Sequence, residues 1–200
     1  MAKKHPQHIV CIKASQVAHS NGKTVDYKLN AADLMLGQRN RLEHDFDFRQ
    51  VLAVAIFMHE GKIWAYRRAT SGGENRLHGK LAIAVGGHWD AEDVVWDGSV
   101  VDVGASTQVA LQRELDEEID VQANILNSHV LDEVICANAT EVDRLHIAQV
   151  SVYEIDAAAV KSKEDQLDPV GFLTPDEILA RDDCETWTTI IAEIVKKQQG

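Results

Sequence analysis

The chain has 200 residues, which is enough for one domain with a substantial core. It carries 20 Lys and Arg against 32 Asp and Glu, and the formal net charge of −12 argues against nucleic-acid polymers and membrane surfaces as partners. The longest apolar run, 51–58, is too short to span a bilayer, and the first residues lack a signal peptide's apolar stretch. Three scattered cysteines, Cys11, Cys136 and Cys184, favour a reducing compartment, so we expect a cytoplasmic protein.

The first half of the chain predicts mainly strands. Residues 8–14 predict a strand, and residues 30–37 predict a short helix with Asn30 as its cap. Residues 51–68 predict a hairpin, since two β-rich runs flank a turn that contains Gly61. After a loop-like stretch, residues 81–85 predict a buried strand that ends at Gly86 and Gly87. An acidic, irregular segment follows at 88–104.

The second half alternates helices and strands. We expect a helix over 106–120, strands over 128–136 and 145–155, and a last helix over 185–197. The sequence "TPDE" at 174–177 is typical of a helix start, with Thr174 as cap and Glu177 completing a capping box. No Pro- or Gly-rich linker divides the chain. The sequence therefore predicts a single α/β domain over 46–200, with an N-terminal extension over 1–45 packed on it.

The predicted helix contains "RELDEEID" at 113–120, which places five carboxylates in eight positions. On a helical wheel, three apolar residues make the core-facing stripe: Leu111, Leu115 and Ile119. Three glutamates converge on one patch beside that stripe: Glu114, Glu117 and Glu118. Asp116 and Asp120 lie on the remaining face and look like ordinary solvated charges. Partly buried like charges are unfavourable unless a cation neutralises them, so the patch indicates either a Mg²⁺ or Mn²⁺ site or a plain charged helix face.

The order of these residues resembles the second half of the Nudix box, the signature R-E-apolar-x-E-E-x-G-apolar of the Nudix hydrolases. Gly86 and Gly87 end a strand where that box begins, and residues 104–106 fall where the family has Gly-Glu-Ser or Gly-Glu-Thr. The flanks "AYRRATSGGENRLHGKLAIAVGGH" at 65–88, "ANATEVDRLHIAQVSVYEI" at 137–155 and "ETWTTII" at 185–191 are similar to a bacterial and archaeal Nudix subgroup. The resemblance covers roughly residues 50 to 195.

The resemblance implies a Nudix fold, in which a mixed β-sheet lies between α-helices. It also implies metal-dependent hydrolysis of a diphosphate linkage in a nucleoside diphosphate derivative, with Mg²⁺ or Mn²⁺ as cofactor. The metal ligands would be Glu114, Glu117 and Glu118. The catalytic residues would be Glu117, Glu118 and Arg113; either glutamate could take a proton from water, whereas Arg113 braces a glutamate. A cationic rim with two glycines would bind the phosphates: Arg67, Arg68, Arg76, His78, Lys80, Gly86 and Gly87.

Three departures separate the chain from the family pattern. The segment between Gly87 and the helix is longer than the standard spacing, Ala105 replaces the first glutamate of the box, and Asp120 replaces its glycine. Acids of the insertion could compensate for the missing glutamate: Asp90, Glu92, Asp93, Asp97 or Asp102. Two acids outside the box, Glu133 and Glu141, are further candidates for the general base. We expect His88, His146 and most of the tryptophans to be structural.

Three other interpretations remain. Ala105 and the insertion favour a Nudix-fold module that binds or senses a nucleotide without turnover. A prenyl-diphosphate isomerase of the same fold needs a cysteine near the strand that ends in Gly-Gly, and no cysteine lies between Cys11 and Cys136. A purely structural acidic domain is the third. The expected partner is a small nucleotide-type diphosphate, and a homodimer is a further possibility.

Overall fold

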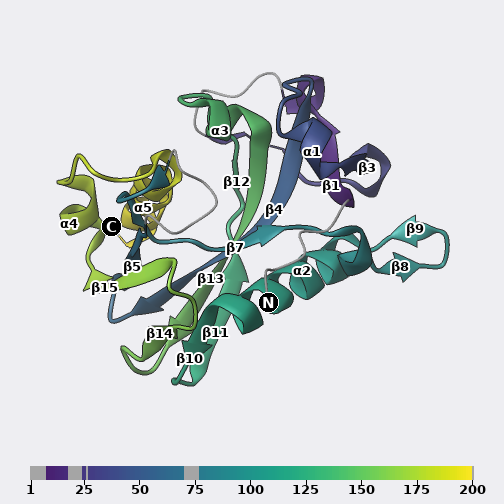
Figure 1. The fold of residues 1–200 in the computed structure, drawn as a ribbon. Coiled ribbons are helices and arrows are strands. Elements are labelled where there is room, and N and C mark those ends of the chain that lie inside the picture. The colour runs from purple at the N-terminus through teal and green to yellow at the C-terminus, as the bar shows by residue number, and fades with distance from the viewer. Residues whose placement is uncertain (1–7, 18–23, 26, 70–76, 200) are drawn as a thin grey trace. The chain divides into compact units, whose positions relative to one another are not determined.

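The structure, a computed structural model, describes residues 8–17, 24–25, 27–69 and 77–199. The chain divides into two compact units, each built from segments far apart in sequence. The first comprises Met1–Ala53, Gly87–Arg113 and Asp132–Gln149, and the second comprises Val54–Gly86, Glu114–Leu131 and Val150–Gly200. Four elements contribute residues to both units (Figure 1): β4 (Phe48–His59), β7 (Val85–His88), α2 (Val103–Glu118) and β13 (His146–Ile155). The predicted division into an extension over 1–45 and a domain over 46–200 stays a prediction.

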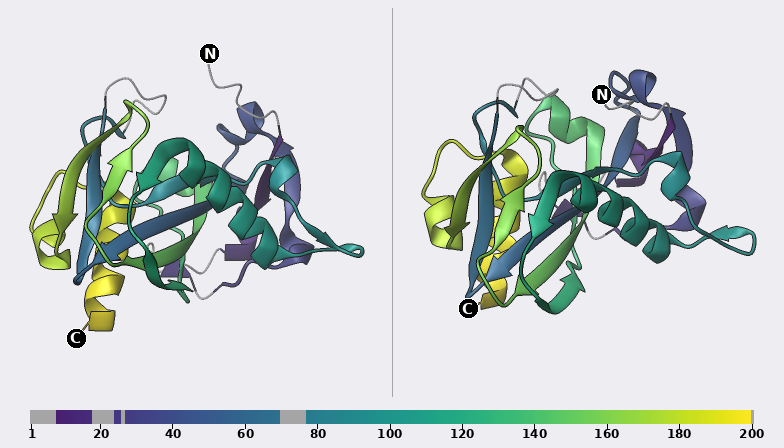
Figure 2. Two further views of the ribbon diagram at one scale, coloured as in Figure 1. Left: turned by 90° about the horizontal axis from the view of Figure 1, so that it is seen from below. Right: turned by 60° about the horizontal axis from the view of Figure 1, so that its bottom comes forward.

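The first unit is built from short antiparallel pairings. The strand predicted at 8–14 is confirmed as β1 (His8–Lys13), which pairs with β3 (Met35–Gln38) and with the start of β4. β12 (Val134–Ile135) pairs with β2 (Thr24–Val25) and with β13. The remaining elements of this unit are α1 (Arg39–Leu42), α3 (Glu141–Leu145), β8 (Trp96–Asp97), β9 (Val100–Val101) and the 3₁₀ turns Ala14–Val17, Ala31–Asp33 and Ala91–Asp93. The hairpin of β8 and β9 projects beyond the start of α2 (Figure 2).

The helix predicted over 30–37 is wrong beyond its first turn. The Asn30 side chain does act as a cap, since it accepts a hydrogen bond from the Ala32 amide at 3.0 Å, but the 3₁₀ turn ends at Asp33. Met35–Gln38 then forms a strand because each of its residues has a partner in β1. Gly37 lies so close to Leu42 that an added Cβ would stand 2.8 Å from its side chain. Tertiary pairing thus overrides local helix propensity here.

The second unit contains the predicted hairpin. β4 pairs with β5 (Lys62–Arg68) through Met58–Ile63 and His59–Lys62, which leaves a two-residue turn. Both turn residues have positive φ, 49° at Glu60 and 75° at Gly61, as a type I′ turn requires. β5 also pairs with β6 (Leu81–Ala82) and β15 (Leu167–Leu173). Two further antiparallel pairs join β11 (Ile125–Val130) to β13 and β10 (Ile119–Val121) to β14 (Val160–Ser162).

Two helices close the chain, and both were predicted. Thr174 caps α4 (Pro175–Leu179) and forms a capping box with Glu177, as its sequence indicates. α5 (Thr186–Gln199) buries an apolar face that includes Ile190, Ile191 and Ile194. Among the described residues, no helix is both long enough and apolar enough to span a membrane.

Two predicted strands are interrupted. The run 81–85 divides into β6 and β7 around Ile83 and Ala84, and the Ala84 carbonyl accepts a hydrogen bond from the Tyr66 hydroxyl at 2.7 Å. Gly86 and Gly87 lie inside β7 rather than after the strand, and Gly86 has φ 139°. The run 128–136 likewise divides into β11 and β12, which belong to different units. The strand predicted over 145–155 is confirmed as β13.

Candidate active site

Helix α2 positions the acidic residues. It begins at Val103, because Asp102 accepts a hydrogen bond from the Ala105 amide at 2.9 Å and so caps the helix. The predicted core stripe is confirmed at Leu111 and Ile119, which are 1% and 3% exposed, whereas Leu115 is only half-buried. Small side chains near the start of the helix complete its buried face: Ser106, Thr107 and Ala110. The helix ends at Glu118, earlier than predicted, because Ile119–Val121 pairs with β14.

The acids of the helix differ in burial as the wheel predicts. Glu114, Glu117 and Glu118 are all half-buried, whereas Asp116 is exposed. Asp120 departs from the prediction of a solvated helical charge. It is half-buried in β10, where it lies opposite Lys161 of β14. Its carboxylate accepts a hydrogen bond from the side-chain Nε2 of Gln122 at 2.8 Å.

Glu114, Glu117 and Glu118 lie toward the C-terminal end of α2, where a negative charge is least favourable. The carbonyl end of a helix carries a partial negative charge, and the last turn of α2 contains no basic residue. Lys163 supplies part of the compensation, because its Nζ donates to the Asp116 carbonyl and its backbone amide donates to the Glu118 carbonyl, each at 2.8 Å. Glu114, Glu117 and Glu118 thus place three half-buried carboxylates near this end of the helix.

Arg68 brings a positive charge near this patch. Its Nε donates to Glu185, whose side chain is only 11% exposed, and its guanidinium lies 5.8 Å from the centroid of the Tyr66 ring. The pKa of Arg68 is raised by Tyr66, whose phenolate forms only at high pH, and by the negative charges of Glu185 and Glu118, so Arg68 keeps its charge. Burial raises the pKa of Tyr66 itself, which therefore remains a neutral hydroxyl. Glu185 was not predicted as a site residue, and its place directly before the last helix gave no signal of this contact.

Arg113 belongs to the first unit and binds the acidic insertion. Its Nε and one terminal nitrogen form a fork on Asp93, with distances of 3.1 Å and 2.7 Å. The same terminal nitrogen lies 3.3 Å from Asp90 and donates to the His88 carbonyl at 2.9 Å. Asp93 is only 3% exposed, so this is a buried, charge-assisted contact. The brace of Arg113 on a glutamate, which the resemblance implies, stays a prediction. The contacts shown here are with Asp93 and Asp90, two of the five insertion acids proposed as compensating residues.

The other predicted phosphate-binding residues differ in their contacts. Both terminal nitrogens of Arg67 donate to the protein, one to the Gly79 carbonyl at 2.7 Å and the other to Asp183 at 2.6 Å. These contacts tie β5 to two loops and make Arg67 a weaker candidate than Arg68. Lys80 and His78 are half-buried beside β5, as are Gly86 and Gly87 in β7. Arg76 lies outside the described residues.

The two histidines and most of the tryptophans were expected to be structural, and two of these residues make side-chain hydrogen bonds. His88 shares a hydrogen bond of 2.9 Å with the Gln50 side chain, and His146 donates to the Val142 carbonyl at 2.7 Å. Trp64 and Trp89 are buried in the core, whereas Trp96 is 63% exposed on the β8–β9 hairpin. The two outside acids differ in exposure, with Glu133 half-buried and Glu141 exposed on α3.

The donor set of α2 fits a hard divalent ion in chemistry, since three half-buried carboxylates offer oxygen ligands. These carboxylates do not form a preformed metal site. Within the described ranges, no group of three or more His, Cys, Asp or Glu side chains is arranged to hold a metal ion. Binding of Mg²⁺ or Mn²⁺ at Glu114, Glu117 and Glu118 therefore stays a prediction, and it requires these side chains to turn toward a common point.

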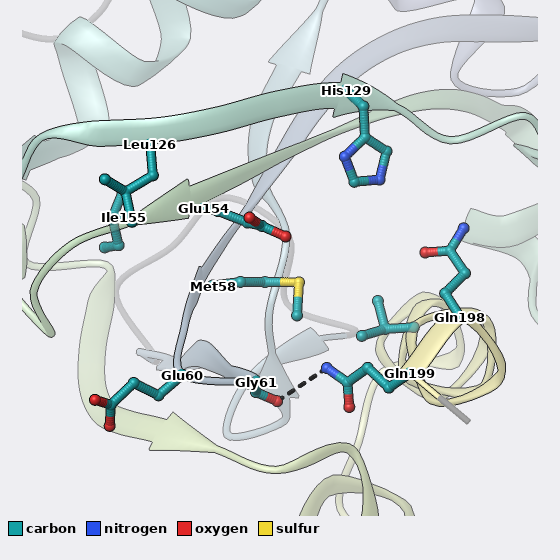
Figure 3. A pocket seen from close by; sticks show the side chains of 10 residues that line it. Met58, Glu60, Gly61, Leu126, His129, Glu154, Ile155, Gln198 and Gln199 are labelled. Atoms are coloured by element: carbon teal, nitrogen blue, oxygen red, sulfur yellow. Dashed lines mark hydrogen bonds between the residues drawn. The ribbon is translucent and has the colours of Figure 1, made fainter.

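A separate groove in the second unit contains none of the predicted site residues. Leu126 and His129 of β11 line one rim, and Gln198 and Gln199 of α5 line the other (Figure 3). The Gln199 side chain closes one end by donating to the Gly61 carbonyl at 3.1 Å. This groove is thus separate from the candidate active site, which consists of the end of α2 and the residues around Arg68.

Comparison with known proteins connects this geometry to a fold. No family model matches the chain. The chain is 28% identical to the protein YmaB of Bacillus subtilis (strain 168) over 165 residues, which are 80% of this chain and 77% of YmaB. The crystal structure of Tm1382, a protein proposed to be a Nudix hydrolase, superposes with a TM-score of 0.69. That match has 20% sequence identity and covers 96% of this chain and 99% of Tm1382.

The predicted fold class is confirmed by the likeness to Tm1382. The chain has the α/β Nudix fold, and the resemblance seen in "RELDEEID" and its flanks is supported at the level of fold. At this degree of identity the likeness says nothing further about chemistry.

Proposed function

We propose that this chain is a Nudix-type hydrolase that cleaves a diphosphate linkage in a nucleoside diphosphate derivative with the help of Mg²⁺ or Mn²⁺. The observation that carries the proposal is the placement of Glu114, Glu117 and Glu118. In a chain with the Nudix fold, these three half-buried glutamates lie on the last turns of α2, where their carboxylates offer several oxygen ligands to a hard divalent ion.

The roles of the residues follow from their surroundings. A divalent ion, when bound, would polarise a phosphoryl oxygen and lower the pKa of a bound water. Glu114, Glu117 and Glu118 would hold that ion, and Glu117 or Glu118 would accept the proton of the attacking water. Arg68, held by Glu185 beside Tyr66, would bind a phosphate oxygen of the substrate. Arg113 would position its part of the chain through Asp93 and Asp90 without touching substrate.

We also propose that the chain is a cytoplasmic protein. The three cysteines are free, which suits a cytoplasmic protein, and the net charge of −12 gives no reason to expect a nucleic-acid or membrane partner. We propose the domain as residues 46–200, with residues 1–45 as an N-terminal extension.

A second candidate is a nucleotide-binding protein of the same fold without efficient turnover. Two observations favour it: Ala105 occupies the place of the first glutamate of the box, and the carboxylates do not form a ready-made metal cluster among the described residues. In this case the Arg68 region would still bind phosphate, but the attacking water would lack an effective base.

A screen of the purified chain separates the two candidates. The panel contains nucleoside triphosphates, dinucleoside polyphosphates, nucleotide sugars and dinucleotide cofactors, each with Mg²⁺, Mn²⁺ or EDTA. Hydrolysis that EDTA abolishes supports the enzyme. Saturable binding of a nucleotide without turnover supports the sensor, and neither binding nor turnover with any member of the panel contradicts both.

A further inference from the structure

Two neighbouring arginines of β5, Arg67 and Arg68, use their side chains differently. Both terminal nitrogens of Arg67 donate to the protein, one to the Gly79 carbonyl and the other to Asp183. The Arg68 side chain instead donates through Nε to Glu185, and its two terminal nitrogens have no hydrogen-bond partner among the residues that the structure describes. The side chain of Arg68 is 37% exposed, so these terminal nitrogens are open to a ligand.

The open end of Arg68 is suited to a phosphate group. The terminal nitrogens of a guanidinium donate in parallel, and this fork matches two oxygens of one phosphate. Glu118, a predicted metal ligand, lies close enough for its charge to raise the pKa of Arg68. Both residues belong to the second compact unit, so the fork lies near the carboxylates of α2.

Backbone hydrogen bonds fix both members of the Arg68–Glu185 pair beside β6. The Leu81 amide donates to the Asp183 carbonyl at 2.9 Å, and the Leu81 carbonyl accepts from the Glu185 amide at 3.0 Å. The Arg68 amide donates to the carbonyl of Lys80, directly before β6, at 3.1 Å. The acid and the arginine are therefore attached to adjoining residues of the same segment, and their contact does not depend on a flexible loop end.

The side chain of Glu185 is committed to Arg68. Glu185 directly precedes α5, which begins at Thr186, and side chains at this place usually cap helix amides. Among the described residues, the Glu185 carboxylate accepts only from Arg68. The Tyr66 ring, whose centroid is 5.8 Å from the guanidinium carbon, adds a second restraint, and the Tyr66 hydroxyl is itself fixed on the Ala84 carbonyl. The guanidinium is thus held by a carboxylate and by a buried ring.

We propose that Glu185 is a positioning residue that holds Arg68 in the orientation in which its two terminal nitrogens bind one phosphate group of the substrate. The identity of the ligand as a diphosphate derivative rests on the proposed function. Glu185 itself does not touch the ligand. Ordering a long side chain at the moment of binding is costly, and an arginine that is already ordered should bind roughly three- to tenfold more tightly.

Calorimetric binding of α,β-methylene ADP with Mg²⁺ to the whole chain tests the proposal, because this analogue cannot be hydrolysed between its two phosphates. Arg68→Ala should weaken binding by about tenfold or more. Glu185→Ser should weaken it roughly three- to tenfold, and serine is a good helix cap, so the start of α5 should stay intact. Asp183→Asn, which alters the contact of Arg67, is the matched control and should bind like the parent.

Glu185→Gln separates orientation from charge. Its side-chain oxygen can still accept from Nε of Arg68, so this variant should keep most of the parent affinity. If Glu185 only balanced the charge of Arg68, both Glu185→Gln and Glu185→Ser would bind the anion more tightly than the parent, and the proposal would be wrong.

A double variant shows whether Glu185 acts through Arg68. In an Arg68→Ala background, Glu185→Ser should cause no further loss of affinity, whereas losses that multiply would contradict the proposal. Circular dichroism verifies that each variant is folded at the assay temperature. Parent-like affinity of folded Glu185→Ser overturns the proposal, and so does the absence of saturable binding to the parent up to about 1 mM analogue.

Hydrolysis is measured separately, so that the two proposals can fail independently. If Arg68→Ala and Glu185→Ser weaken binding of the analogue but the parent hydrolyses no member of the nucleotide panel, the role of Glu185 stands and the hydrolase proposal fails. If the parent hydrolyses a member of the panel and Glu185→Ser has the same KM and the same affinity for the analogue, the hydrolase proposal stands and the role of Glu185 is wrong.

Discussion

At the residue scale, we expect replacement of two neighbouring acids on α2 to change kcat/KM by very different amounts. Glu118 is half-buried at the end of the helix and close enough to Arg68 to affect its pKa, whereas Asp116 is exposed. Glu118→Gln should lower kcat/KM by about 100-fold or more, because it removes a metal ligand or general base. Asp116→Asn should leave kcat/KM close to the parent value. A ratio near one between the two variants would mean that the acids act only as a collective surface field.

A second residue pair tests the contact of Arg113. Asp93→Asn removes the charge from a buried fork, so the free energy of unfolding should fall by about 1.5 to 3 kcal/mol. Glu92→Gln is the matched control, since Glu92 is exposed in the same 3₁₀ turn and should change little. Urea unfolding followed by circular dichroism measures both. Equal stability of the two variants would contradict a structural role for the contact between Arg113 and Asp93.

The burial of the α2 acids could be predicted from the sequence, but the partner of Arg113 could not. The wheel correctly separated the half-buried glutamates from Asp116, because burial on a helix follows its period. It could not identify Asp93 as the partner of Arg113, because that pairing depends on the path of the insertion. The spacing of Asp90 and Asp93 could have predicted the start of a helical turn, since these two residues form a capping box at Ala91–Asp93.

At the element scale, the start of α2 depends on a single side chain. Asp102 caps the helix that carries every predicted metal ligand, and its carboxylate accepts from the Ala105 amide. Asp102→Ala should cost about 1 kcal/mol of stability, as loss of a cap usually does, and should shift the thermal midpoint down. Asp97→Ala on the exposed hairpin is the control and should leave the midpoint unchanged. Similar midpoints for the two variants would show that the helix does not need this cap.

Elements with local signals were predicted well, and elements defined by distant partners were not. The hairpin turn at Glu60 and Gly61 and the capping box at Thr174 are each determined by a few adjacent residues. By contrast, Met35–Gln38 is a strand only because β1 lies beside it, and the run 128–136 divides because β11 and β12 pair at different places on β13. Long-range pairing is not visible in local periodicity, so these boundaries could not have been placed from the sequence.

At the scale of the whole molecule, the net negative charge and the fold both affect the three glutamates of α2. A net charge of −12 raises the cost of every additional negative charge, and three of these charges are half-buried at the carbonyl end of one helix. An ion that binds there in the folded chain and not in the unfolded chain must therefore stabilise the fold through linkage. The stability of the whole chain thus reports on metal binding even where no substrate is known.

Thermal unfolding in Mg²⁺, Mn²⁺ or EDTA measures the stabilisation that metal binding gives the fold. The parent should unfold at a higher temperature with metal than with EDTA, and the increase should grow with metal concentration; an ion present at about 100 times its dissociation constant contributes about 2.7 kcal/mol. Replacing both Glu117 and Glu118 with Gln should abolish the increase while raising the midpoint in EDTA, because the repulsion between the glutamates is relieved. Asp116→Asn should keep the metal response of the parent. If the double variant responds to metal as the parent does, the ion binds elsewhere and the assignment of these glutamates is wrong.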